Sequence, residues 1–330
     1  MKALFIGGTG TISTSISQQL TGMGWDLTLL NRGTHPDRLA AGAQLLQGDI
    51  QDENQISRLL TGQWFDVVVD FIAFEPEQIR RDIRLFQEHC GQFIFISTAS
   101  AYQKPPVHYL ITESTPLSNP FWKYSQDKIA CEDILIQAYR EQGFPVTIVR
   151  PSHTYGDWSI PLCIHGKNGP WQTIRRMKEG RPVLVAGDGT SFWTITHSRD
   201  FARGFIGLMG NVHAVGEAVH ITSDEALPWN QIYLTIAQAL GVKPNLYHVA
   251  TDDLVARDLS LAGPLWGDKA NSVIFDNTKL KRLVPGYAAT IRFDQGIRTT
   301  LAYFESHPEL QKPDPDWDAW TDAVITHQFI

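Results

Sequence analysis

Short apolar runs alternate with longer amphipathic stretches through the first half of this chain. Near-continuous apolar runs are typical of strands buried on both faces of a parallel sheet, and amphipathic stretches of covering helices. The predicted strands are residues 3–6, 27–30, 44–46, 67–71, 93–97 and 146–149. The predicted helices are residues 13–23, 52–61, 76–89 and 123–142. This order predicts an α/β fold with a doubly wound parallel sheet that is covered by helices on both faces.

A glycine-rich turn connects the first predicted strand to the first predicted helix. The turn has the sequence GGTGTIS, with Ser13 where a third glycine is expected. Glycines allow a tight turn and a close backbone approach, and the free N–H groups of the helix N-terminus attract phosphate. Such turns also occur without a ligand. In this setting we interpret it as a pyrophosphate site of a dinucleotide, with Gly7, Gly10, Thr11 and Ile12 as cofactor-binding residues.

The two halves of the chain differ in character. Residues 1–155 are predicted to form a dinucleotide-binding Rossmann domain, to which segments at about 190–225 return. Residues 156–330 have shorter elements and are rich in Gly, Pro and Trp, so we expect mainly a smaller mixed α/β substrate-binding lobe and a C-terminal tail. The tail from residue 308 onwards carries Trp317 and Trp320 and is expected to pack on the body as a short helix.

Composition limits the classes of function. The 330 residues are 43% hydrophobic and 19% charged, which is ordinary for a soluble protein. The net charge of −7, without a basic cluster, gives no support for nucleic-acid binding. No apolar run suggests a signal peptide or a membrane span. Cys90, Cys131 and Cys163 are widely spaced, so we expect reduced thiols of a cytoplasmic protein and no metal site.

Tyr124 and Lys128 are the first candidates for chemistry. A spacing of four residues puts both on one face of the helix predicted at 123–142. A tyrosine with its ordinary pKa near 10 is a poor base at neutral pH. An ammonium group one turn away, together with the positive charge of an oxidised nicotinamide, would favour the phenolate. Taken alone, such a pair is also common on helix surfaces.

A hydroxyl-rich segment, Ser97 to Tyr102, follows the predicted strand at 93–97. Hydroxyls at the carboxyl end of a parallel strand point into the crevice where open sheets bind ligands. With this segment, the chain resembles the extended short-chain dehydrogenase/reductase family, the NAD-dependent epimerase/dehydratase group. The motifs of the resemblance extend over most of the chain: Gly7 and Gly10, Gly48-Asp49-Ile50, Ser97 to Tyr102, Tyr124 and Lys128, Arg150-Pro151, Tyr155-Gly156, Gly187-Asp188-Gly189 with His197 and Asp200, and Phe293-Asp294-Gln295-Gly296.

The resemblance implies three catalytic residues. Tyr124 would be the acid/base, and Lys128 would activate it and bind the ribose next to the nicotinamide. Thr98 would hydrogen-bond the reacting substrate oxygen, with Ser97 and Ser100 as competitors for that role.

The resemblance also implies further cofactor contacts. Asp49 would accept from the adenine amino group, with Ile50 beside the ring, although Asp49 also suits a turn or cap. Ala73 would line the cofactor, and Pro151 and Ser152 would lie near the nicotinamide.

The form of the cofactor depends on Asn31 and Arg32, which follow the second predicted strand. A carboxylate there would pair with the ribose hydroxyls, but none is present, and an arginine suits a 2′-phosphate. Arg32 also suits a solvated loop. We therefore expect NADP or NAD, with NADP slightly favoured.

Two departures from the family pattern narrow the reaction. Sugar-nucleotide 4,6-dehydratases of this family carry an Asp-Glu pair after the active-site Thr, where this chain has Ala99 and Ser100. Dehydration is therefore disfavoured. Trp193 stands where many relatives place an arginine for the substrate pyrophosphate. A nucleotide-sugar substrate would therefore lack the arginine that most specifically binds its pyrophosphate. His153, in the segment that follows Pro151, is most simply a hydrogen-bonded loop residue.

The sequence as a whole favours an NAD(P)-dependent oxidoreductase or epimerase. The expected reaction is hydride transfer at a carbinol or carbonyl carbon of a small sugar-like or nucleotide-sugar substrate. A cofactor that stays bound while the keto intermediate rotates gives epimerisation, and one that exchanges gives oxidation or reduction. The alternative is a non-catalytic NADP(H)-binding sensor or an atypical RNA-binding member. A homodimer through the helix of Tyr124 is a family-level expectation.

Overall fold

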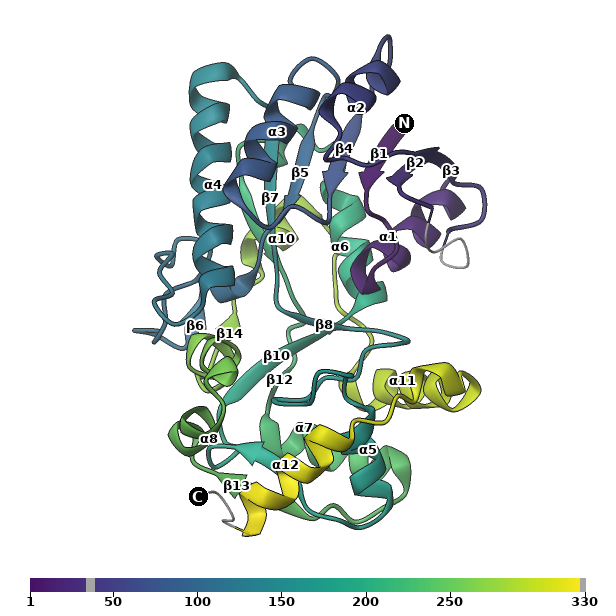
Figure 1. The fold of residues 1–330 in the computed structure, drawn as a ribbon. Coiled ribbons are helices and arrows are strands. Elements are labelled where there is room, and N and C mark those ends of the chain that lie inside the picture. Colours follow the sequence, from purple (N-terminus) through teal and green to yellow (C-terminus); the bar gives the residue numbers. More distant parts are fainter. Residues whose placement is uncertain (34–38, 327–330) are drawn as a thin grey trace.

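Within residues 1–33 and 39–326, which the computed structural model describes, seven strands form one large sheet (Figure 1). Their order is β11-β7-β5-β4-β1-β2-β3, and every neighbouring pair is parallel. The strands are β1 (Lys2–Ile6), β2 (Asp26–Asn31), β3 (Gln44–Gln47), β4 (Val67–Asp70), β5 (Phe93–Ile96), β7 (Val146–Pro151) and β11 (Ala218–Ile221). This confirms the doubly wound Rossmann-type sheet. The order changes direction between β1 and β4, where ligands of such sheets bind at the carboxyl ends.

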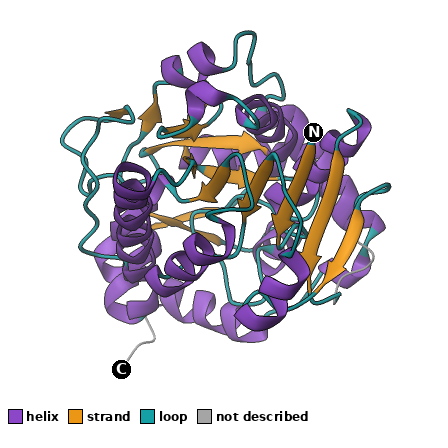
Figure 2. Ribbon diagram, turned by 90° about the horizontal axis from the view of Figure 1, so that it is seen from above, coloured by secondary structure: helices purple, strands orange, loops and turns teal. Residues whose placement is uncertain are grey.

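Helices cover both faces of this sheet, as Figure 2 shows from above. On one face α1 (Thr11–Gly22) and α6 (Ser198–Leu208) bury residues such as Ile16, Leu20 and Phe205. The other face carries α2 (Glu53–Leu60), α3 (Pro76–Phe86) and α4 (Lys123–Gln142), which bury Ile56 and Leu135 among others. The predicted helices are confirmed within three residues at each end.

The region near 190–225 is divided between two sheets. Helix α6 and strand β11 join the large sheet. Strand β10 (Phe192–His197) instead joins a small mixed sheet with β8 (His153–Tyr155) and β12 (Ala226–Pro228). The prediction lacked β11, because the buried His220 interrupts its short apolar pattern.

The second half forms a separate packed body, in the lower part of Figure 1. Two short parallel pairs help build it: β9 (Val183–Ala186) with β13 (Leu246–Val249), and β6 (Leu110–Ile111) with β14 (Ile274–Phe275). Its helices are α5 (Trp171–Lys178), α7 (Trp229–Leu240), α8 (Thr251–Arg257), α9 (Ala262–Pro264), α11 (Phe293–Ser306) and α12 (Pro315–Thr326), whereas α10 (Thr278–Leu283) packs with α6 against the large sheet. A five-residue π-helical turn covers Leu265–Lys269. No helix in the described part of the chain is long and apolar enough to cross a membrane.

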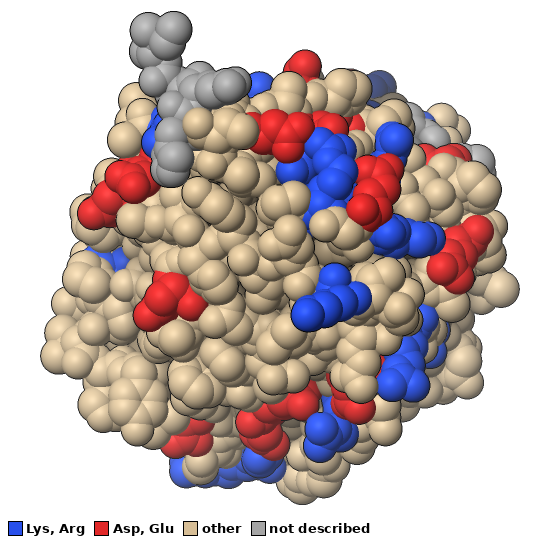
Figure 3. Space-filling model, turned by 90° about the horizontal axis from the view of Figure 1, so that it is seen from below, with Lys and Arg blue, Asp and Glu red and all other residues tan. Residues whose placement is uncertain are grey.

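The C-terminal tail packs as the short helix α12, as predicted. Its Trp317 stacks on Trp320 and donates a hydrogen bond to Thr173 of α5. Arg176 of α5 is 1% exposed and donates to the carboxylates of Asp318 (2.6 Å) and Asp322 (2.7 Å). The face seen from below carries acidic and basic side chains interspersed, without a large field of one sign (Figure 3).

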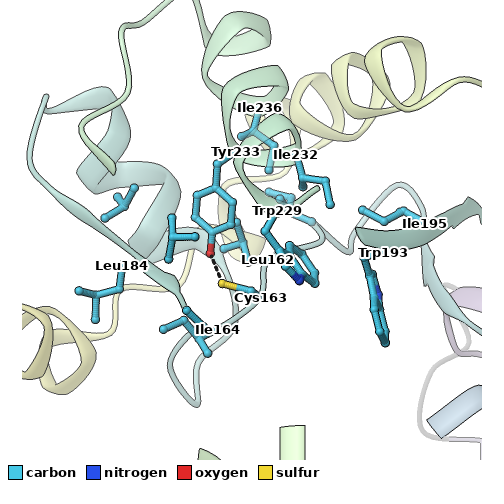
Figure 4. Packing of buried hydrophobic residues seen from close by; sticks show 14 of the residues in the cluster. Leu162, Cys163, Ile164, Leu184, Trp193, Ile195, Trp229, Ile232, Tyr233 and Ile236 are labelled. Atoms are coloured by element: carbon cyan, nitrogen blue, oxygen red, sulfur yellow. Dashed lines mark hydrogen bonds between the residues drawn. The ribbon is translucent and has the colours of Figure 1, made fainter. Parts of the chain in front are cut away.

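An apolar core holds this second body together. Figure 4 shows Leu162, Ile164, Leu184 and Ile236 gathered around the ring of Tyr233. The Tyr233 hydroxyl lies 3.1 Å from the sulfur of Cys163 (Figure 4). All three cysteines are buried free thiols. Trp193 and Trp229 stack at one side of the cluster, with ring centroids 6.1 Å apart. This core therefore extends to the small sheet of β8, β10 and β12.

Replacing Arg176 by Met should loosen the attachment of α12. The change removes a buried cation that also donates to the carbonyl of Pro182 (2.8 Å). Because these acceptors lose their donor, we expect the free energy of unfolding to fall by roughly 2 kcal/mol. The matched variant Arg175→Met removes an arginine that is 55% exposed and pairs with Glu179, so its effect should stay within about 0.5 kcal/mol. Thermal and denaturant unfolding measure both, and equal losses would contradict the anchoring role.

Candidate active site

The predicted glycine turn lies between β1 and α1, at the point where the strand order changes direction. Gly7 and Gly8 have φ values of +96° and +92°, and a Cβ on Gly7 would lie 2.9 Å from a methyl carbon of Ile72. Both the conformation and the space thus favour glycine. The Ser13 hydroxyl accepts a hydrogen bond from the Gly10 N–H at 2.8 Å. The serine at the position of the third glycine therefore stabilises the turn. Thr11 and Ile12 begin α1, whose N-terminus faces the crevice.

Asn31 and Arg32 lie at the carboxyl end of β2. The side-chain oxygen of Asn31 accepts from the Gly33 N–H at 2.7 Å, while its amide nitrogen is buried and has no hydrogen-bond partner in the described residues. The Arg32 side chain is exposed. A buried amide donor without a partner in the described residues, beside an exposed guanidinium, fits the ribose end of a dinucleotide.

Asp49 forms a local turn. Its carboxylate accepts from the Gln51 N–H at 3.0 Å, which is the alternative role left open by the sequence. Ile50 beside it is buried. Ala73 lies after β4, where the Asp70 carboxylate accepts from its N–H at 2.7 Å. These contacts fix the two loops that flank the expected adenine and nicotinamide ends of the crevice.

Lys128 is only 2% exposed and fixed by two hydrogen bonds. Its ammonium donates to the carbonyls of Ala73 and Ile96, each at 2.7 Å. It also lies 4.5 Å from the ring centroid of Phe74. Burial lowers the pKa of Lys128 to about 8. Since an ammonium has three donors, one N–H remains for a ligand.

Tyr124 lies one turn earlier on α4, with its ring between Phe74 (6.2 Å) and Trp122 (5.0 Å between centroids). Burial raises the pKa of Tyr124, and a hydrogen bond with Thr98 opposes that rise. The expected lowering of the tyrosine pKa by Lys128 is therefore absent from this state. The reason is geometric: the Lys128 ammonium is 5.9 Å from the phenol ring centroid and is directed to backbone carbonyls.

The three candidate hydroxyls after β5 have different partners. Ser97 donates to the buried carboxylate of Glu132 and so points away from the crevice. Ser100 lies 2.7 Å from the hydroxyl of Ser125. The Thr98 hydroxyl lies 2.9 Å from that of Ser100, and of the three it is the one that opposes the rise in the pKa of Tyr124. This favours Thr98 over its two competitors.

A cavity of about 280 Å³ opens beside these side chains. It brings Thr98 and Tyr124 together with Pro151 and Ser152, whose hydroxyl donates to the Thr194 carbonyl at 2.8 Å. The full lining is Thr98, Ala99, Ser100, Trp122, Tyr124, Pro151, Ser152, His153, Trp193, Asp268 and Lys269. Lys128 and the glycine turn lie outside it, on the side of the expected cofactor. Tyr124 thus lines this cavity while Lys128, one turn away on the same helix, does not.

Sequence reasoning missed Asp268 and Lys269 in this cavity. They belong to the π-helical turn, which has no clear sequence signal. It also missed a buried support behind the site, in which Arg150 pairs with Glu132 and donates to the Tyr102 hydroxyl at 3.2 Å. In the described residues, no three His, Cys, Asp or Glu side chains are grouped as a metal site requires.

The family model described as "NAD dependent epimerase/dehydratase family" matches residues 3–222. The chain belongs to this family. A 2′-dehydrokanamycin reductase of Streptomyces kanamyceticus is 24% identical over 87% of this chain and 80% of its own length. A chloroplast stem-loop binding protein of 41 kDa from Arabidopsis thaliana is 26% identical over 75% of this chain, which spans 65% of that protein.

Solved structures of epimerases share the fold. The UDP-glucuronic acid 4-epimerase of Bacillus cereus, in complex with UDP-glucuronic acid and NAD, superposes with a TM-score of 0.74 at 18% identity. The match covers 93% of this chain and 99% of the epimerase. Relatives within the NAD-dependent epimerase/dehydratase family thus include epimerases and reductases.

His153 should stay uncharged throughout the neutral range. It lies edge-on to Trp229, and burial lowers the pKa of His153 to about 3. Because the folded pKa is below that of a free histidine, the unfolded chain takes up a proton below about pH 6.5 that the folded protein does not, and this acts against folding as the pH falls. Imidazole NMR, with His153→Gln to assign the signal, should show no titration between pH 5 and 8. A His153 signal with a midpoint near 6.5 would contradict this.

Proposed function

We propose that this protein is an NAD(P)-dependent oxidoreductase or epimerase that transfers hydride at a carbinol or carbonyl carbon of a sugar-like substrate. The single observation that carries the proposal is that Thr98 and Tyr124 line one cavity, with the buried Lys128 one helical turn from Tyr124. These residues are the proposed catalytic group. A bound nicotinamide would supply or accept the hydride.

Tyr124 is proposed as the acid in the direction of reduction. Because burial raises its pKa, its phenol carries a proton at neutral pH and can donate it to a substrate oxygen as charge develops there. Thr98 would orient that same oxygen. In the direction of oxidation Tyr124 must lose its proton, which the positive charges of Lys128 and of an oxidised nicotinamide would favour.

Lys128 is proposed to bind the ribose next to the nicotinamide. Its two bonds to backbone carbonyls fix the ammonium and leave one donor for a ribose hydroxyl. At the other end of the crevice, the proposed cofactor contacts are the glycine turn, the orphaned amide of Asn31 and Arg32. Asp49, Ile50, Ala73, Pro151 and Ser152 remain proposed contacts between those ends.

Dehydration is disfavoured in this proposal. Ala99 brings no carboxylate to the cavity after Thr98, and the Ser100 hydroxyl is held by Ser125. A sugar-like substrate is supported by a cavity that combines hydroxyls with the faces of Trp122 and Trp193. Trp193 lines this cavity at the position where relatives carry an arginine for a pyrophosphate, so the cavity lacks that anchor for a nucleotide.

A non-catalytic or RNA-binding role is the second candidate, favoured by the likeness to the stem-loop binding protein. The net charge of −7 and the interspersed charges of Figure 3 give RNA little electrostatic attraction. A non-catalytic sensor would also have no need of a protonated tyrosine beside Thr98.

Tyr124→Phe should separate an enzyme from a sensor. The change removes only the hydroxyl, so hydride transfer should fall at least about a hundredfold while NADPH or NADH binding persists. The assay follows nicotinamide absorbance with UDP-glucose or UDP-glucuronic acid and oxidised cofactor, and with 2′-dehydrokanamycin and reduced cofactor. Tyr109→Phe, at a tyrosine 58% exposed, is the matched control and should be neutral. A Tyr124→Phe variant as active as the wild type would refute the role of Tyr124.

Arg32→Ala should reveal the form of the cofactor. Loss of a guanidinium that binds a 2′-phosphate should raise the Kd for NADPH about tenfold and leave the Kd for NADH unchanged. Energy transfer from tryptophan to reduced nicotinamide measures both constants. Arg58→Ala, at another exposed arginine, is the control. A preference of the wild type for NADH, with Arg32→Ala weakening neither cofactor, would reject the NADP assignment.

A further inference from the structure

Asp268 is a carboxylate in the substrate cavity that the proposed hydride transfer does not use. Its side chain lines the cavity together with Thr98 and Tyr124. Burial raises the pKa of Tyr124, and the charge of Asp268 adds to that rise. No hydrogen bond to its carboxylate occurs within the described residues. A charge that the protein leaves without donors, in a cavity beside the reacting groups, points to a ligand.

The turn that carries Asp268 is fixed to the catalytic segment. The Asn119 side-chain amide donates to the carbonyls of Ser100 (2.8 Å) and Gly267 (2.7 Å). On the other side of Asp268, the carbonyl of Lys269 accepts from the indole N–H of Trp229 at 3.0 Å. Hydrogen bonds to the carbonyls of Gly267 and Lys269 thus fix the backbone on both sides of Asp268, as a preorganised binding group requires.

Lys104 supplies the opposite charge, and it is 3% exposed. Its ammonium lies 5.8 Å from the ring centroid of Trp193 and donates no hydrogen bond within the described residues. Burial raises the pKa of Asp268, and the charge of Lys104 opposes that rise. Burial lowers the pKa of Lys104, and the charge of Asp268 opposes that fall. The two groups do not approach within 4.0 Å. The buried ammonium of Lys104 and the partly exposed carboxylate of Asp268 attract one another without forming an ion pair.

We propose that Asp268 binds substrate by accepting a hydrogen bond from a hydroxyl next to the reacting carbon. The inference rests on the proposed function and names its substrate class: a neutral polyhydroxylated ring. The positive charges of Lys104 and Lys269 disfavour an ammonium group at this point. The faces of Trp122 and Trp193 suit the apolar face of a sugar.

The test uses the full chain saturated with NADPH and two matched probes, methyl α-D-glucopyranoside and its 2-amino-2-deoxy analogue. Saturation-transfer NMR measures their Kd. We expect the glucoside to bind the wild type and to bind Asp268→Asn about tenfold more weakly, with the affinity for NADPH unchanged. Asp253→Asn, at an exposed carboxylate, is the matched control. Should Asp268→Asn lower the unfolding temperature, Asp268→Glu keeps the charge but displaces it and should weaken the glucoside likewise.

Three results would overturn the inference: equal affinity of wild type and Asp268→Asn for the glucoside, tighter binding of the amino sugar through Asp268, or no glucoside binding by a wild type that binds NADPH. Failure of the proposed function is a separate observation, since it would appear as absent NADPH binding or as unimpaired hydride transfer by Tyr124→Phe.

Discussion

The buried ammonium of Lys128 is the contact on which the geometry of the site depends. It joins the carbonyl of Ala73, after β4, to that of Ile96, at the end of β5. Two neighbouring strands and helix α4 are thereby held in one arrangement. Removing the ammonium would leave two buried carbonyls without a donor, which is costly in a low-dielectric interior. The position of Tyr124, one turn away on α4, follows from the same attachment.

Much of the fold was predictable because its signals are local. Apolar runs fixed the strands of the large sheet except β11, and the glycine turn indicated the crevice between β1 and β4. Gly7 could be interpreted from its type alone, since few residues tolerate φ near +96°. The pair Tyr124 and Lys128 followed from helical spacing, and the family resemblance added Thr98.

The remainder of the site depends on distant contacts that leave no pattern in the chain. Asp268 reaches the cavity from a π-helical turn, and its neighbour Gly267 is held by Asn119 across 148 positions of sequence. The pKa of Tyr124 was also beyond sequence reasoning. The spacing of four residues placed Lys128 on the same face of α4 as Tyr124. Burial of the phenol and the direction of the Lys128 ammonium, however, decide whether the pKa of Tyr124 rises or falls.

The amide of Asn119 has a consequence for how the protein assembles during synthesis. One side chain binds a carbonyl of the first half and a carbonyl of the second, and contacts so remote in sequence form late in folding. The parallel sheet and its glycine turn need only the earlier part of the chain, apart from β11. A newly made chain would therefore acquire its nucleotide crevice before the wall that carries Asp268 closes over it. Competence for reaction is then the last property that the maturing protein gains.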